Sequence, residues 1–278
     1  MGVIHSETKF GRKNRRNRKG LVESLLKVII LAIIQGVTEF LPVSSSGHLV
    51  VAKGLFGLES PGVALEVALH VGTLVAIVLY YWQDLMTLAT APFRGDLAAR
   101  KSAWRQLLLI AIASVPIAPA GFFLKGFIEP LFSNSRAVGG LLVATAVIVS
   151  STAFMRRSRK SIDVPRSALV GVAQAIAILP GISRSGATIA MGNLVGIAPA
   201  DAVRFSFLIA VPAFVGAICY ELIFYSADFR LAYIPGAVVS AVVGYFSLKL
   251  LINAVKSNKL WMFGPYCAIV GLVAILFL

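Results

Sequence analysis

The sequence predicts an all-α polytopic membrane protein. Its 278 residues are 58% apolar and only 14% charged, whereas soluble domains average about 25% charged residues. Apolar stretches recur that are long enough to cross a hydrocarbon core, which takes about 20 helical residues. Because only helices satisfy their own backbone hydrogen bonds in such a stretch, we expect about six full transmembrane helices. They cover residues 63–82, 107–123, 137–155, 205–224, 234–252 and 260–278.

Two further apolar segments, residues 25–41 and 164–179, are too interrupted to cross cleanly. The first is stopped by Pro42 and a run of small polar residues, the second by Pro180 and Gly181. Proline lacks an amide hydrogen and breaks a helix at this point. Helix, polar turn and short helix is the pattern of a re-entrant element, which is tolerated at membrane depth where it lines a cavity or packs on protein.

The two halves of the chain resemble each other at an offset of 139 residues. Each half reads as an interrupted element followed by three spans, so an odd number of crossings inverts the second copy relative to the first. We therefore expect an inverted-topology repeat with two re-entrant helix-turn-helix elements. One integral membrane domain covers residues 21–278, with halves at about 21–160 and 161–278, after a disordered basic tail at 1–20. The matched pairs are Gln35 with Gln174, Ser44 with Ser183, Ser46 with Ser185, and Gly47 with Gly186.

The net charge of +14 lies mostly in short segments that flank the spans, at 94–105, 156–160 and 256–259, and in the tail. Positive charge in such segments stays cytoplasmic, so membrane lipids are expected partners and nucleic acid is not. The tail contradicts this rule if the first element is re-entrant, so the side of the N-terminus stays open. Cys219 and Cys267 lie in separate apolar runs, and we expect free thiols.

The polar residues of the two interruptions, QGVTEFLPVSSSGH at 35–48 and PGISRSG at 180–186, indicate a site for a phosphorylated molecule. Arg184 offers a fork of donors that matches phosphate oxygens. Serine hydroxyls and helix starts also favour anions. Gly47 and Gly186 would let the backbone come close to the phosphorylated ligand. A serine beside His48 could attack with the imidazole as base. Glu39 could orient the histidine, act as base or hold a cation, with Glu66 within reach.

Less specific interpretations remain for each of these residues. Serine and glycine in membrane helices usually serve close helix packing. Glu39 and Arg184 could form a purely structural ion pair. His70 is interpreted as a packed, hydrogen-bonded histidine, and Glu221 as an interfacial residue. Two interrupted helices that concentrate polar groups favour a functional site over these interpretations.

The two motifs closely resemble the signature segments of the bacterial undecaprenyl-diphosphate phosphatase family, which is linked to bacitracin resistance, and FSFLIAVP at 205–212 is also similar. The resemblance implies hydrolysis of undecaprenyl diphosphate to the monophosphate, which recycles the lipid carrier for cell-wall polymers. It also implies Mg or Ca as cofactor, with Glu39 as metal ligand, and a multi-pass protein of the bacterial inner membrane whose site opens externally. The implied catalytic residues are Glu39, Ser45, His48 and Arg184, and the implied substrate-binding residues are Gln35, Ser44, Ser46, Gly47, Ser183, Ser185 and Gly186.

Several family members have glutamate where this chain has Gln35, which places the essential carboxylate at Glu39. A transporter or flippase of a polyprenyl phosphate lipid is the alternative function, suggested by the inverted repeat. Whether Ser45 or an activated water attacks stays open at this point. The identity of the metal and whether the protein forms a homodimer also stay open.

Overall fold

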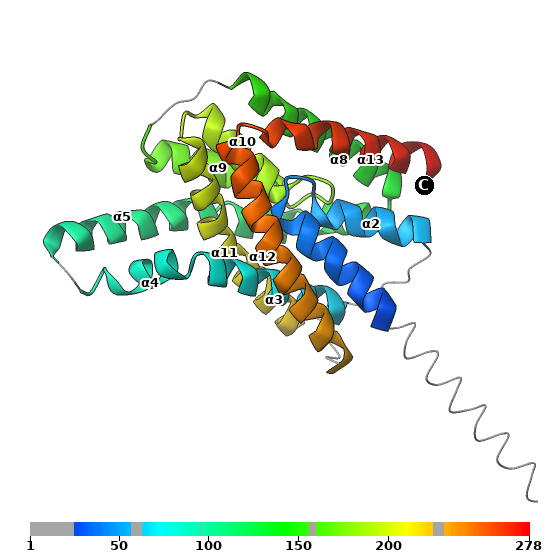
Figure 1. Ribbon diagram of the computed structural model, residues 1–278, viewed down its shortest axis with the longest axis horizontal. Helices are drawn as coiled ribbons and strands as arrows, with labels where there is room; N and C mark the ends of the chain where they lie inside the picture. Colours follow the sequence, from blue (N-terminus) through cyan, green and yellow to red (C-terminus); the bar gives the residue numbers. More distant parts are fainter. Residues whose placement is uncertain (1–24, 57–62, 95, 156–159, 225–230) are drawn as a thin grey trace, which may run out of the picture.

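The computed structural model describes residues 25–56, 63–94, 96–155, 160–224 and 231–278 (Figure 1). These residues form helices joined by turns, and no extended strand occurs among them, which confirms the all-α class. The predicted tail at 1–20 lies outside the described residues. The helices are 25–40, α2 Ser45–Phe56, α3 Val63–Tyr80, α4 Trp82–Thr90, α5 Leu97–Ser114, α6 Ile117–Phe123, α7 Lys125–Leu131, α8 Ser135–Ser151, α9 Val164–Ile176, α10 Arg184–Leu194, α11 Pro199–Phe224, α12 Ile234–Lys256 and α13 Phe263–Phe277.

Within the described chain, five helices are long and apolar enough to cross a membrane, or six if the bent pair α3–α4 counts as one. The polytopic class is therefore confirmed, with two corrections to the predicted spans. The span predicted at 63–82 bends by 76° after Tyr80 and continues as α4. The span predicted at 107–123 begins earlier, at Leu97, because α5 extends it.

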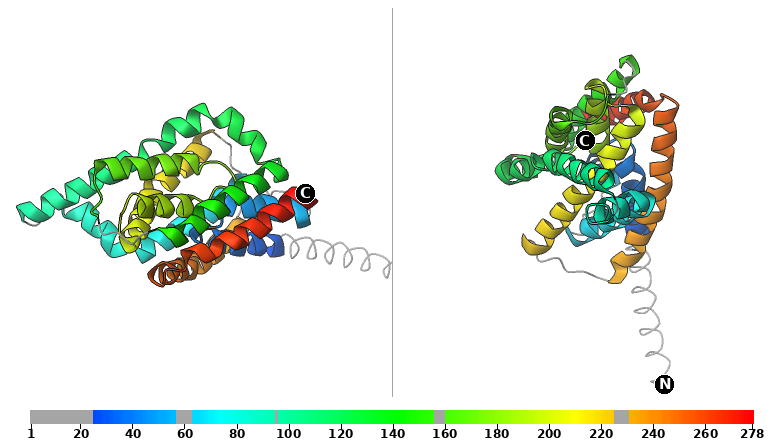
Figure 2. Two further views of the ribbon diagram at one scale, coloured as in Figure 1. Left: turned by 90° about the horizontal axis from the view of Figure 1, so that it is seen from above. Right: turned by 90° about the vertical axis from the view of Figure 1, so that its left-hand side faces the viewer.

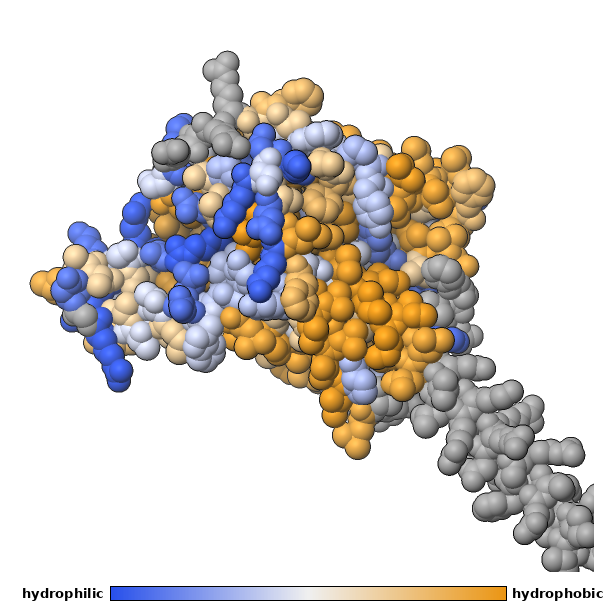
Figure 3. Space-filling view, viewed as in Figure 1, coloured by the Kyte–Doolittle hydropathy of each residue, from blue (hydrophilic) through white to orange (hydrophobic). Residues whose placement is uncertain are grey.

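The outer surface is apolar over much of the molecule. On α12, a row of residues four apart is exposed by 54–64%: Ile234, Val238, Val242, Phe246 and Leu250. Figure 3 shows hydrophobic surface over the lower centre and right of this face, and hydrophilic residues gathered on the left near α4 and α5. Such a stripe would be a liability in water but suits lipid contact, because the bilayer solvates apolar side chains.

The first helix-turn-helix element is formed by the helix at 25–40 and α2. The helix ends at Phe40, just before Leu41 and Pro42, as expected for residues that precede proline. Ser44 then takes a left-handed conformation with φ of 70°, and α2 begins at Ser45. With 12 residues, α2 is about 18 Å long, too short to cross a core of about 30 Å.

The second element, α9 and α10, returns to the end of the molecule from which it started. The Lys160 amide donates to the Gly196 carbonyl oxygen at 3.0 Å, and Arg166 Nε donates to the Val195 carbonyl oxygen at 3.1 Å. These bonds join the residues around the start of α9 to those just after α10. Because α9 and α10 form a hairpin, this element has the shape predicted for a re-entrant segment.

The two elements start from opposite ends of the molecule. Lys53, near the end of α2, pairs with Glu66, near the start of α3, at 2.6 Å; we call this the mouth end. At the other end of α3, Asp84 on α4 pairs with Arg204 near the start of α11. Arg204, Arg105 and Ile162, just before α9, line one small cavity there, which we call the basic end. The first element therefore returns to the mouth end and the second to the basic end, as an inverted repeat requires.

Helices α8 and α13, the last of each half, pack side by side (Figures 1 and 2). Each also holds the polar turn of the other half. On α8, Thr145 Oγ1 donates to the Gly181 carbonyl oxygen at 2.7 Å and accepts from the Ser183 amide at 3.0 Å. On α13, Cys267 Sγ contacts the Pro42 carbonyl oxygen at 3.6 Å. The α8–α13 pair therefore fixes the two turns relative to each other. Cys219 and Cys267 are free thiols, as predicted.

Close packing of α8 on α13 leads to a stability prediction. A Cβ added at Gly139 would lie 2.7 Å from the Gly271 carbonyl oxygen, whereas one added at the neighbouring Gly140 meets nothing within 4 Å. We expect Gly139→Ala to destabilise the protein by about 1–3 kcal/mol through overpacking. Gly140→Ala is the matched control and should be neutral or stabilise by up to about 1 kcal/mol. Thermal unfolding of both variants in detergent checks this, and equal stability would contradict it.

Candidate active site

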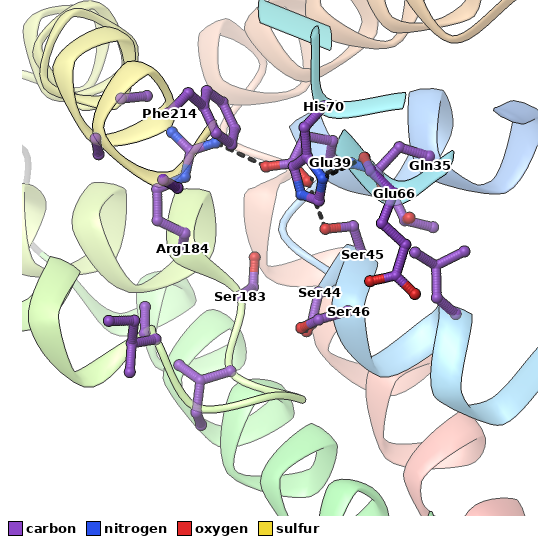
Figure 4. Close-up of a pocket in the computed structure, with 18 of the residues that line it drawn as sticks. Gln35, Glu39, Ser44, Ser45, Ser46, Glu66, His70, Ser183, Arg184 and Phe214 are labelled. Carbon is purple, nitrogen blue, oxygen red and sulfur yellow. Dashed lines mark hydrogen bonds and ion pairs between the residues drawn. The ribbon is translucent and has the colours of Figure 1, made fainter. Parts of the chain in front are cut away.

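Both interrupted elements open onto one cavity of about 300 Å³, which α3, α6 and α11 complete. Figure 4 shows the serines of the two turns facing a common space, with Arg184 and Glu39 above it. The two segments singled out in the sequence therefore meet, although they lie far apart along the chain. The polar lining residues are Gln35, Thr38, Glu39, Ser44, Ser45, Ser46, Lys53, Glu66, His70, Gln174, Ser183, Arg184 and Glu221.

Glu39 is the centre of the site. It is 8% exposed, and both of its oxygens accept hydrogen bonds. Oε2 accepts from Ser45 Oγ at 2.5 Å and from Gln35 Nε2 at 2.9 Å, and Oε1 accepts from Arg184 Nη2 at 2.8 Å. A short bond between a hydroxyl and a carboxylate is strong, and it orients the Ser45 proton toward a base. The second-motif arginine thus faces the carboxylate and hydroxyl of the first motif.

Arg184 keeps donor capacity for a ligand. Its guanidinium carbon lies 4.5 Å from the centre of the Phe214 ring, a cation–π contact that fixes the plane of the group. Only Nη2 is bonded to Glu39; Nη1 is buried and has no hydrogen-bond partner among the described residues. A buried guanidinium donor without a partner is costly, so Nη1 is suited to receive an oxygen atom of a bound anion.

The two turns are built alike. Ser44 Oγ accepts from the Gly47 amide at 3.3 Å, and Ser183 Oγ accepts from the Gly186 amide at 3.1 Å. Each thereby satisfies a free amide at the start of a helix. The residues that follow, Ser45 and Arg184, begin α2 and α10. Equivalent positions of the two halves thus carry a hydroxyl in one and a guanidinium in the other, and both helix starts face the cavity.

His48 does not lie where the sequence predicted. It is absent from the cavity wall, and Ser45 donates to Glu39 instead. Its Nδ1 donates to the Ser44 carbonyl oxygen at 2.8 Å, and its Nε2 accepts from the Tyr266 hydroxyl at 2.8 Å, with the two rings stacked. With both ring nitrogens occupied behind the turn, His48 supports the left-handed Ser44 rather than taking a proton from Ser45. The role of His48 as the base stays a prediction, and this geometry favours a supporting role.

This geometry predicts a moderate effect for His48. We expect His48→Ala to lower turnover by about 10-fold by loosening the turn before Ser45, whereas removal of a general base typically costs about 10²–10⁴-fold. Tyr266→Phe, which removes only the hydroxyl, should act in the same direction and less strongly. The pH–rate profile should keep its shape in both variants. A lost limb of that profile in His48→Ala would restore the base assignment.

Three other predicted substrate-binding residues also lie off the cavity wall. Gly47 packs against Leu142 and Gly181, Gly186 packs against Val149, and Ser185 Oγ donates to the Leu41 carbonyl oxygen at 3.3 Å. They hold the two turns against each other and against α8. This geometry favours helix packing as the role of the two glycines, and their contact with a ligand stays a prediction.

Several cavity residues were not among the predicted site residues. His70 was interpreted as a packed, hydrogen-bonded histidine and Glu221 as an interfacial residue, and both line the cavity. His70 Nδ1 donates to the Glu66 carbonyl oxygen at 2.8 Å, and Glu66 itself pairs with Lys53. The spacing of Glu66 and His70, four residues apart on one helix face, was the available signal. Gln174 was visible only as the partner of Gln35 in the repeat.

The cavity holds oxygen donors of the kind that a hard divalent cation prefers, but its side chains alone do not complete a metal site. It offers three carboxylates, Glu39, Glu66 and Glu221, and oxygen ligands are those that Mg²⁺ and Ca²⁺ prefer. In the described chain no cluster of three or more acidic, histidine or cysteine side chains could hold a metal alone. Amide oxygens are available, however, because Gln35 Oε1 is buried next to Glu39 with no partner among the described residues. A cation would therefore need amide and ligand oxygens besides carboxylates.

Fold and site define a class: a polytopic membrane protein whose two halves together form a buried site for a phosphorylated ligand. The chain belongs to the family described as bacitracin resistance protein BacA, which matches residues 28–273. It is 40% identical over 263 residues to an undecaprenyl-diphosphatase of Desulfosudis oleivorans, covering 87% of this chain and 94% of that protein. It is 35% identical over 276 residues to one of Methanosphaera stadtmanae, covering 91% and 97%.

Proposed function

We propose that this protein hydrolyses undecaprenyl diphosphate to undecaprenyl phosphate and inorganic phosphate. The observation that carries this activity is the arrangement of Ser45, Glu39 and Arg184, in which one carboxylate accepts from both a hydroxyl and a guanidinium. Membership of the BacA family and the activity named for its relatives support the lipid diphosphate as substrate. Transport of a polyprenyl phosphate, the alternative, leaves the Ser45–Glu39 bond without a purpose.

In the proposed reaction, Ser45 Oγ attacks the terminal phosphorus while Glu39 Oε2, 2.5 Å away, takes the hydroxyl proton. The bond from the terminal phosphorus to the bridging oxygen breaks, and undecaprenyl phosphate leaves with the proton that Glu39 took up. Water then attacks the phosphorylated Ser45 and gives a proton to Glu39, which passes it to Ser45 Oγ as the Oγ–phosphorus bond breaks to release phosphate. Arg184 donates to the transferring group through Nη1 and stabilises its charge in the transition state.

The apolar part of the cavity suits the lipid tail. Ile117, Phe132, Ile178 and Ile218 line it beside the polar residues, and Phe132 is 44% exposed. An apolar wall that continues to the outside of a membrane protein lets a prenyl chain stay in the bilayer while its diphosphate enters. The binding energy of the tail would then come from burial of its methylenes.

The mouth end is proposed to face the exterior of the bacterial inner membrane. Glu66 and Glu221 lie near it, whereas Arg105, Arg204 and Lys256, at the end of α12, lie at or near the basic end. Short segments rich in arginine and lysine stay cytoplasmic. This orientation supports release of phosphate outside the cell.

A divalent cation, Mg or Ca, is part of the proposal. Glu39 and Glu66 are its expected carboxylate ligands, and a bound cation would neutralise charge on the diphosphate.

Phosphate release from undecaprenyl diphosphate by the purified protein in detergent tests the function. Turnover should appear with Mg²⁺ or Ca²⁺ and disappear with chelator, and Arg204→Lys, at the basic end, serves as an active control. Undecaprenyl phosphate and inorganic phosphate should form in equal amounts. Binding of the lipid without any phosphate release would overturn the proposal in favour of transport.

A further inference from the structure

An apolar groove lies on the outer surface beside the cavity. It runs between α6–α7 and α9, has a volume of about 290 Å³, and only apolar residues line it among those that the structure describes. Its main lining residues are Pro116, Ala120, Leu124, Phe127, Val172 and Ile176. Because Phe127, Val172 and Ile176 are exposed by 47–65%, the groove is open to a hydrocarbon chain from the lipid-facing surface.

The groove and the cavity share one residue, Ile178, which follows α9. Residues next to each other in the chain line opposite sides of the wall between the two spaces. Ile117 and Ala177 line the cavity, whereas their neighbours Pro116 and Ile176 line the groove. The wall is therefore no thicker than one helix.

Ile178 also fills the space between Gly121 on α6 and the end of α9. A Cβ added at Gly121 would lie 3.3 Å from Ile178 Cδ1, and it would meet no other segment of the chain within 4 Å. Because Gly121 has no side chain, the tip of Ile178 closes the wall at this point. A single side chain can change its rotamer without movement of the helices, so Ile178 can open a path from the cavity to the groove.

We propose that this groove binds the prenyl tail of the substrate where the tail leaves the cavity past Ile178. The inference rests on the proposed function for the identity of the lipid. With the diphosphate held at Ser45 and Arg184, the first isoprene units would lie along Ile117 and Ile178, and the next would enter the groove. Each carbon group buried there adds binding free energy, so the groove favours substrates with long tails.

Acyl chains of the bilayer are the competing occupants, because the groove opens to the membrane. The tail of a bound substrate is tethered by its diphosphate, which raises its effective concentration at the groove and favours it over free chains. A second, mostly apolar groove lies between α8 and α13 and includes Val147. It shares no residue with the cavity, so it offers an internal comparison.

Phosphate release by the full chain in detergent, from undecaprenyl diphosphate and from geranyl diphosphate, tests the proposal. Val172→Phe fills the groove and should lower kcat/KM for undecaprenyl diphosphate about tenfold, because the tail loses buried area. The value for geranyl diphosphate, whose tail is too short to occupy the groove, should change by less than about twofold. Ala175→Phe, in the same groove, should act in the same direction. Val147→Phe, at a 66% exposed valine in the second groove, is the matched control and should leave both values unchanged.

The ratio of the two kcat/KM values does not depend on the fraction of folded enzyme, so misfolding cannot produce the expected shift. An unchanged ratio in both Val172→Phe and Ala175→Phe would overturn the tail-binding groove and leave the proposed function standing. An equal shift of the ratio in Val147→Phe would also overturn it, since the effect would then belong to the lipid-facing surface in general.

Photocrosslinking gives a second measurement that does not need turnover. Undecaprenyl phosphate that carries a diazirine in its tail should label residues 172–179 more strongly than residues 143–151, and excess unlabelled lipid should remove the difference. Equal labelling of the two segments would overturn the tail-binding groove. Preferred labelling of residues 172–179 without phosphate release from either diphosphate would overturn the proposed function and support the groove as a prenyl-binding site.

Discussion

Ser45→Ala is expected to lower phosphate release from undecaprenyl diphosphate by more than about 10²-fold, because it removes the attacking oxygen. The fold should be unaffected, since Ser45 is partly exposed on the cavity and its side chain bonds to Glu39 alone among the described residues. Binding of the lipid should change much less than turnover, as expected for a group that acts in the transition state. Single-turnover kinetics and a lipid-binding assay separate the two quantities.

Ser114→Ala is the matched control for Ser45. Ser114 bonds to the Ile110 carbonyl oxygen within α5 and does not line the cavity, so its removal should leave turnover within about twofold. A phosphorylated Ser45, trapped by rapid acid quench and located by mass spectrometry, would be the direct product of the proposed first step. Full turnover in Ser45→Ala would assign the attack to water.

Arg184→Ala and Glu39→Gln are each expected to lower turnover by more than about 10²-fold, because the two residues act as a unit. Arg184→Ala leaves the Glu39 carboxylate buried without its guanidinium partner. Glu39→Gln removes the base and leaves the positive charge of Arg184 uncompensated. The double variant should therefore lose much less than the product of the two single losses. A double-mutant cycle on turnover measures this coupling.

The control for the pair is Arg204→Lys with Asp84→Asn, which alters an ion pair at the basic end. These variants should retain phosphate release, although their stability in detergent can fall. Independent, multiplicative effects of Arg184→Ala and Glu39→Gln would contradict the coupled site. Retained turnover in Arg184→Ala alone would contradict the proposed mechanism.

Much of the fold could be predicted because membrane-spanning helices are recognisable in a sequence by their length and apolar composition. The offset between Ser44 and Ser183 also predicted that two polar turns would meet, and the Glu39–Arg184 pair lies where they do. The bend after Tyr80 was not predictable in this way. No proline or glycine marks it in the sequence, and it depends on contacts with distant helices such as the pair of Asp84 with Arg204.

The roles inside the motif were harder to predict than its location. Sequence places His48 near Ser45, but only the helix phase decides that its ring turns toward Tyr266. The same phase turns Gly47 and Gly186 toward other helices and leaves Ser46 and Ser183 on the cavity. His70 and Glu221 come from α3 and α11, whose approach to the site depends on tertiary packing. A single sequence carries no signal of such contacts.

Because the turn that carries Ser45 rests against Tyr266 and Cys267 on α13, the ribosome must finish almost the whole chain before that turn gains its support. The nascent protein would therefore sit in the bilayer without a supported Ser45 turn until α13 had been inserted. Onset of its activity would then follow the insertion of α13.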